Sequence, residues 1–231
     1  MKLPELKISR CSPAGKERLR RWLTEWEISL ALRGPATEKE EAEAEPAGDI
    51  PVSSPFDDPA PSAGQIRLFP PLDRLTARRP LYAALLRKEN GVLIAAPFGS
   101  FSEPAFEGEL LTGREAGPLR VLCCWNSARL SHEFMKNSWL VDEMTGGELA
   151  DALAVLEHVR CGSVPPEPLS GRIGPPCWHP ADPRARYALE EREIMDSLAA
   201  RDNSGGESLR YPLPETAWRM AAENRPKWGK K

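Results

Sequence analysis

Three arginines lie close together in one short segment of the chain. Residues 72–79 contain Arg74, Arg78 and Arg79 beside one carboxylate, Asp73. Guanidinium groups bind phosphate oxygens through charge-assisted hydrogen bonds. The three arginines are therefore candidates for binding the phosphate backbone of a nucleic acid. The alternative for each of them is an ion pair or an exposed loop charge.

Other segments carry weaker chemical signals. Cys177 and His179 flank a tryptophan, but two potential ligands without a partner cluster do not predict a metal site. The C-terminal residues 218–231 interleave tryptophan with arginine and lysine, which is typical both of single-strand binding and of termini that dock on a partner. Phosphate-loop, H-E-x-x-H and G-x-S-x-G motifs are absent, so the sequence predicts no metal and no other cofactor.

Composition limits the size of the core and the class of protein. The chain has 231 residues, 24 prolines, 41% hydrophobic residues and a formal net charge of -3. This composition predicts a compact region of about a hundred residues with loosely structured flanks, and it does not indicate nucleic-acid binding by charge alone. The five cysteines form no C-x-x-C pair, and no apolar run is long enough to span a bilayer. We therefore expect a cytoplasmic protein with reduced thiols and no membrane contact.

The arginine segment lies within a stretch, residues 64–162, whose pattern is that of short strands. Alternating or apolar runs separated by turn residues predict strands at 65–69, 80–88, 92–97, 106–110, 119–125 and 138–141. Glu89-Asn90-Gly91 is typical of a hairpin turn. Short strands at this spacing favour a closed or nearly closed β-barrel. In the fourth strand, Phe106, Gly108 and Leu110 alternate with Glu107 and Glu109.

One helix is expected to complete this domain. Thr145 and Glu148 have the spacing of a capping box, and the helix that follows, residues 146–160, is expected to stop at Gly162. Its leucines, at positions 149, 153 and 156, predict one face packed on the barrel.

The flanks divide into three parts. Residues 1–33 contain an amphipathic helix, 13–32, whose apolar residues predict docking on a protein core: Leu19, Trp22, Leu23, Trp26 and Leu30. Residues 34–63 are acidic and proline-rich and predict a linker. Residues 163–231 form a proline-rich extension with a predicted helix at 187–200.

The order and spacing of the elements in residues 64–162 resemble the MazF/PemK family of endoribonuclease toxins, which have an SH3-like barrel. The resemblance rests on short motifs: Gly64-Gln65-Ile66, the step Arg79-Pro80, Ala96-Pro97, the alternation over 104–111, the run 119–126, and 138–141 leading into the capped helix. It implies a mainly β fold, a small SH3-like barrel capped by one helix, with helical N- and C-terminal extensions.

The resemblance also implies roles for individual residues. Arg79 matches the family's active-site arginine and would stabilise the charge that builds on a phosphate attacked by a ribose 2′-hydroxyl. Ser100 lies one residue beyond the family's serine or threonine position, which here is Gly99. Asp73 is the candidate for the acidic residue of the first loop. Where the family has Asp-Gln, this chain has Trp125-Asn126, so the proton donor and acceptor that cleavage needs are altered.

Three functions stay open at this point. The first is a divergent or degenerate family member that binds RNA or a partner protein, with weak or no endoribonuclease activity. The second is an active toxin-type endoribonuclease with an antitoxin as its protein partner. The third is a non-catalytic adaptor, in which helix 13–32 and the C-terminal tail hold partners or a second copy of the chain. An open arginine-lined groove favours RNA, and a groove filled by the chain's own extension favours the adaptor.

Overall fold

The structure is a computed structural model, and it describes residues 14–15, 17–24, 59–69, 81–114, 117–165, 167–174, 182–202 and 206–209. Some of the predicted features lie outside these residues: Asp73, Arg74, Arg78, Arg79, the Cys177–His179 motif and the tail 218–231. Most of the predicted linker, 34–63, also lies outside them.

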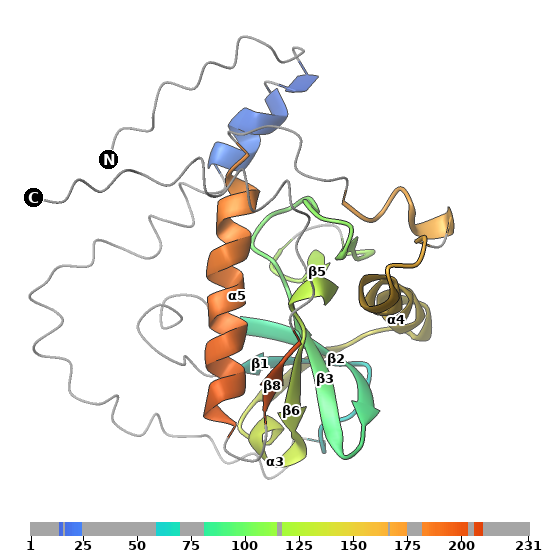
Figure 1. Cartoon of the computed structure of the whole chain (residues 1–231), viewed down its shortest axis with the longest axis vertical. Helices are drawn as coiled ribbons and strands as arrows, with labels where there is room; N and C mark the ends of the chain where they lie inside the picture. Colours follow the sequence, from blue (N-terminus) through green and yellow to red (C-terminus); the bar gives the residue numbers. More distant parts are fainter. Residues whose placement is uncertain are drawn as a thin grey trace, which may run out of the picture.

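An antiparallel sheet of six strands forms the centre of the molecule (Figure 1). Its order is β7-β1-β2-β3-β6-β8, with β1 at Gln65–Phe69, β2 at Leu81–Glu89, β3 at Val92–Pro97, β6 at Ala128–Ser131, β7 at Trp139–Glu143 and β8 at Glu207–Ser208. A second sheet pairs β4, Glu109–Leu111, with β5, Val121–Cys123, and it is joined to the end of β3 by a bridge between Phe98 and Leu122. The sequence predicted a mainly β domain with flanking helices, and the structure has a mainly antiparallel sheet with several helices.

The hairpin between β2 and β3 has the predicted turn. Asn90 has φ of 50° and Gly91 has φ of 87°. Both values lie in the left-handed region, which asparagine and glycine tolerate better than other residues. The turn therefore fixes the register, in which Glu89 pairs with Val92.

Both faces of the two central strands are buried, because apolar residues follow one another without alternation. Ala84 and Leu86 of β2 belong to one hydrophobic cluster, whereas Ala83 and Leu85 belong to another. The first cluster is closed by α4, Gly146–Cys161, and the second by α5, Pro183–Arg201. The expectation of a single helix on the sheet is corrected here, since a strand that is apolar on both sides needs a cover on each.

The capped helix forms as predicted. The Thr145 hydroxyl accepts a hydrogen bond from the Glu148 N–H at 3.2 Å, and a Glu148 carboxylate oxygen accepts one from the Thr145 N–H at 2.7 Å. Gly162 ends α4 with φ of 63°. Each partner satisfies a backbone donor that the first helical turn would otherwise leave unpaired.

Between β3 and β7 the elements differ from the predicted ones. The fourth strand is shorter than predicted, because residues 106–108 form a turn in which the Glu109 N–H donates to the Phe106 carbonyl at 2.9 Å. The fifth strand ends early in a 3₁₀ helix, η2, at Cys124–Asn126. Strand β6 and the short helix α3, His132–Met135, were not predicted, and a further 3₁₀ turn, η3, lies at Glu167–Leu169.

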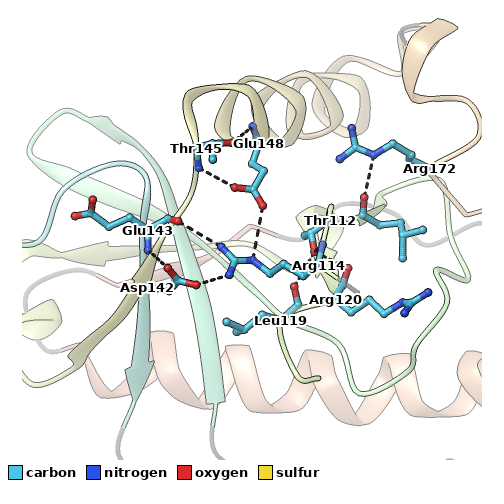
Figure 2. A network of polar contacts seen from close by, with 10 residues as sticks. Thr112, Arg114, Leu119, Arg120, Asp142, Glu143, Thr145, Glu148 and Arg172 are labelled. Carbon is cyan, nitrogen blue, oxygen red and sulfur yellow. Dashed lines mark hydrogen bonds and ion pairs between the residues drawn. The ribbon is translucent and has the colours of Figure 1, made fainter. Parts of the chain in front are cut away.

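An arginine ties the β4–β5 hairpin to the start of α4 (Figure 2). Arg114 donates to the carboxylate of Asp142 and lies 3.7 Å from the Glu148 carboxylate, which also takes part in the helix cap. The Thr112 hydroxyl donates to the Leu119 carbonyl at 2.8 Å across the hairpin. These contacts join the β4–β5 hairpin, β7 and the first turn of α4, so this polar network holds α4 in place.

The N-terminal helix, residues 14–24, lies at the N-terminal end of α5 (Figure 1). Leu19 and Trp22 are fully buried against Phe101 and Tyr187. The predicted docking is confirmed for these residues, and Trp26 and Leu30 lie outside the described part. None of the helices that the structure describes combines the length and apolar character needed to cross a bilayer.

Candidate functional site

Ser100, the one predicted catalytic residue that the structure describes, lies against α5. Its N–H donates to Oε1 of Glu191 at 3.2 Å, and its hydroxyl hydrogen-bonds the hydroxyl of Tyr187. Both partners come from the C-terminal extension. Ser100 follows β3, so the end of this strand is one of the places where the extension meets the sheet.

A buried carboxylate lies in the same cluster. Glu109 of β4 accepts hydrogen bonds from the Trp125 indole at 3.0 Å and from the Ala105 N–H at 2.5 Å. Glu191 of α5 accepts a weaker bond from the Cys123 thiol at 3.7 Å. Glu109 is only 6% exposed, although it alternates with apolar residues in the sequence. Strand β4 is covered on both sides, by the α4 cluster through Leu110 and by Trp125 on the other side.

The environment of Glu109 favours its neutral form. The pKa of Glu109 is raised to about 7, chiefly by burial and further by the charge of Glu191. The two hydrogen bonds that it accepts and the charge of Arg184 act in the opposite direction and limit the rise. A carboxyl group that titrates near neutral pH could exchange protons with a bound molecule.

A buried ion pair completes the cluster. The Arg184 guanidinium donates to the Asp182 carboxylate at 2.6 Å and to the Pro104 carbonyl at 2.8 Å. Asp182 is also the N-cap of α5, accepting from the Arg184 N–H at 3.1 Å. The pair therefore links the first turn of α5 to the loop before β4.

The hollow between these side chains is small. It is lined by Gly99, Ser100, Phe101, Glu103, Ala105, Glu109, Val121, Cys123, Arg184, Tyr187 and Glu191. Its volume is about 10 Å³ for the centre of a water-sized sphere, which is room for about one water molecule. An RNA nucleotide does not fit there. Among the described residues, no group of three or more His, Cys, Asp or Glu side chains could hold a metal ion.

Two further positions singled out by the family resemblance take part in the contact between the polar cluster and α5. Trp125 is 2% exposed and packs edge to face on Phe106 as well as donating to Glu109. Asn126 is also buried, and its side chain donates to the Glu191 carbonyl of α5 at 2.9 Å. Trp125 and Asn126, like Ser100, therefore hold the polar cluster and α5 together.

Sequence reasoning missed most of this cluster. The overlooked members are Glu109, Asp182, Arg184, Tyr187 and Glu191. A signal for the helical ones exists, since positions 184, 187, 191, 195 and 198 follow the spacing of one helix face, and a stripe that mixes charged and apolar residues indicates a buried polar contact.

Many of the described arginines pair with carboxylates. Ion pairs of 4.0 Å or less involve Arg18, Arg20, Arg21, Arg87, Arg114, Arg129, Arg160, Arg172 and Arg184. A guanidinium held by a carboxylate has less charge to offer a phosphate.

No family model, curated protein or solved structure matches this chain.

Proposed function

We propose that this chain is a MazF/PemK-like SH3-like barrel protein that has lost endoribonuclease chemistry and acts by binding a protein partner. The observation that carries the proposal is the position of α5. It lies on Ser100 through Tyr187 and Glu191, at the end of β3 where the family resemblance would put part of the active site. The chain's own extension therefore occupies space that a substrate would need.

The extension is built into the fold. Met195 and Leu198 of α5 are fully buried and share a hydrophobic cluster with β2, β3 and β6. Burying one such side chain contributes about 1.5–3 kcal/mol. Removing α5 to admit RNA would expose both side chains and the sheet face beneath them. We therefore treat α5 as a permanent cover.

The candidate acid–base groups are also occupied. The Ser100 hydroxyl is bonded to Tyr187, and both carboxylate oxygens of Glu109 accept hydrogen bonds from the protein. A general base must reach the proton that it removes, directly or through one water. With room for about one water, the hollow does not bring an RNA hydroxyl within that reach.

The ion-paired arginines favour a protein partner over RNA. Surfaces that bind a phosphate backbone gain affinity from cations that are free to replace counterions. Here, for example, Arg18 and Arg21 both pair with Glu103, and Arg129 pairs with Glu89 and Glu207. Such mixed-charge surfaces are common where proteins contact one another.

The test is expression of the wild type and of Arg79→Ala in a bacterial host, scored for growth arrest and RNA fragmentation, with an active toxin of the family as the positive control. We expect neither form to arrest growth or cut RNA. Cleavage by the wild type that is lost in Arg79→Ala would overturn the proposal. RNA binding is measured in parallel over a salt series, and tight salt-dependent binding that needs Arg79 would favour the RNA-binding function instead.

A further inference from the structure

The N-terminal helix lies in a groove formed by the loop after β3 and the first turns of α5. Leu19 and Trp22 are 0% exposed, and their neighbours are Phe101 at 8% and Tyr187 at 1%. Phe101 and Tyr187 meet edge to face, with ring centroids 5.1 Å apart. The groove thus has a rigid aromatic wall that accepts one large apolar side chain.

The floor of the groove is a fixed cation. The Arg184 guanidinium carbon lies 3.4 Å from the centroid of the Trp22 ring, which is a close cation–π contact. The Asp182 carboxylate and the Pro104 carbonyl hold Arg184 in place. Because the guanidinium is already oriented, it selects an aromatic side chain over an aliphatic one.

The rim of the groove is acidic. Glu103 pairs with Arg21 and, at 3.2 Å, with Arg18. The two arginine side chains are 50% and 51% exposed, so these pairs lie at the edge of the contact. In the chain's own helix, the aromatic residue of this contact thus follows two arginines, which lie one and four positions earlier.

The chain's own helix fits this groove imperfectly. The indole Nε1 of Trp22 is buried and has no hydrogen-bond partner in the described structure. An unsatisfied buried donor costs about 1–3 kcal/mol. The described buried contacts of this helix gather at one small cluster of Leu19, Trp22, Phe101 and Tyr187, whereas α5 contributes to three clusters. Among the described residues, the N-terminal helix thus takes part in fewer hydrophobic clusters than α5 does.

We propose that this groove is the partner site of the adaptor, and that its partner is a basic amphipathic helix of another protein with the pattern Arg-x-x-Arg-Trp. The chain's own helix is the resident that this partner replaces. The inference rests on the proposed function, because it names the class of partner that the adaptor binds. The resident helix competes through its tether, which keeps a linked segment at roughly millimolar effective concentration.

The probe is a fluorescein-labelled peptide of residues 12–33, and its binding to the full chain is measured by anisotropy. Wild type is compared with Trp22→Ala, whose own helix no longer fills the groove. We expect Trp22→Ala to bind the peptide about 30-fold more tightly, the size of a typical binding hot spot. The Arg18→Glu/Arg21→Glu chain changes only the exposed rim. It replaces Trp22→Ala in this comparison if Trp22→Ala fails to fold. Arg20→Glu, a 70% exposed site on the same helix, is the matched control and should behave as wild type.

Specificity is tested by reversing the rim charge. Glu103→Arg, placed in the opened Trp22→Ala chain, should weaken peptide binding about tenfold or more, and a peptide carrying Arg18→Glu and Arg21→Glu should restore it. Equal affinity of wild-type and opened chains would overturn the proposal. Equal binding of a Trp22→Ala peptide would do the same.

A second copy of the chain is the competing occupant. Sedimentation of the wild type should show a monomer. A dimer that dissociates on Trp22→Ala would mean that two copies exchange their N-terminal helices, and this result would overturn the proposal of a separate protein partner. The RNA-cleavage experiment above is independent of these readouts. A failed peptide experiment with no cleavage rejects only the groove, and cleavage that depends on Arg79 rejects the proposed function whatever the peptide does.

Discussion

The two halves of α5 are held to the same sheet by different forces. In the C-terminal half, Met195, Leu198 and Ala199 pack into an apolar cluster with β2, β3 and β6. In the N-terminal half, Arg184 and Glu191 are buried among charged and hydrogen-bonding partners. One helix therefore has an apolar attachment at one end and a largely polar attachment at the other.

The difference separates stability from orientation. Apolar burial stabilises the helix on the sheet but does little to set its position, because dispersion contacts are not directional. The polar contacts have defined geometry, and each buried group that loses its partner is costly. We infer that the C-terminal half supplies most of the net stability and that the N-terminal half sets where α5 lies relative to Ser100 and the N-terminal helix.

The largest expected effect is that of breaking the buried ion pair. Arg184→Met leaves the Asp182 carboxylate, which is 0% exposed, without its cation and removes the donor to Pro104. Loss of one partner of a buried pair costs about 3–5 kcal/mol. Urea unfolding should show this loss, and Arg201→Met, at the exposed end of the same helix, is the control. Adding Asp182→Asn should recover part of the loss, and no recovery would mean that the cost is one of packing.

The second effect concerns the apolar half. Leu198→Ala leaves a cavity under α5 and should lower the free energy of unfolding by about 3 kcal/mol. The loss should be the same from pH 5 to pH 8, because the contacts that Leu198 makes in this cluster are with apolar side chains. Glu193→Ala on the exposed side of α5 is the control. A loss that varies with pH would show that the two halves are coupled.

Strands β1, β2, β3 and β7, the hairpin turn and the helix cap could be predicted because each depends on neighbouring residues. Asn90-Gly91 needs positive φ, and Thr145 with Glu148 satisfies the first amides of α4 whatever lies around them. The apolar run of β2 was predicted as a strand, but one covering helix was expected and not two. The sequence does not say which segment supplies the second cover, and here it is α5, about 90 residues farther along the chain.

The candidate site could not be predicted for a related reason. Glu109 alternates with apolar neighbours and has the pattern of an exposed residue, yet distant side chains bury it. Ser100 was selected through the family resemblance, but its partners Tyr187 and Glu191 come from a segment outside that resemblance. Whether a polar group is buried depends on tertiary contacts, so the local sequence pattern does not predict it.

The third effect is a pH dependence that comes from Glu109 of β4, whose charge interacts with Arg184 and Glu191 in the polar half of α5. Glu109 has a pKa raised from 4.5 to about 7, so the folded state holds its proton more tightly than the unfolded state does. Stability therefore falls as pH rises from about 4.5 to about 7, by at most about 3 kcal/mol, and then levels off. Glu109→Gln should remove most of this slope in thermal unfolding measured across the range. Glu107→Gln, on an exposed neighbour, should keep it, and an unchanged slope in Glu109→Gln would assign the titration to another group.

The smallest expected effect isolates the contact between α5 and Ser100. Tyr187→Phe removes the hydroxyl that bonds Ser100 but keeps the ring that packs on Phe101, so it should cost only about 1 kcal/mol. Ser100→Ala should cost a similar amount. If the two hydroxyls interact chiefly with each other, the double variant should lose less than the sum of the single losses, a difference that a double-mutant cycle in urea measures. Strict additivity would mean that Ser100 and Tyr187 act through other partners, and the polar half of α5 would then be positioned by Arg184 and Glu191 without them.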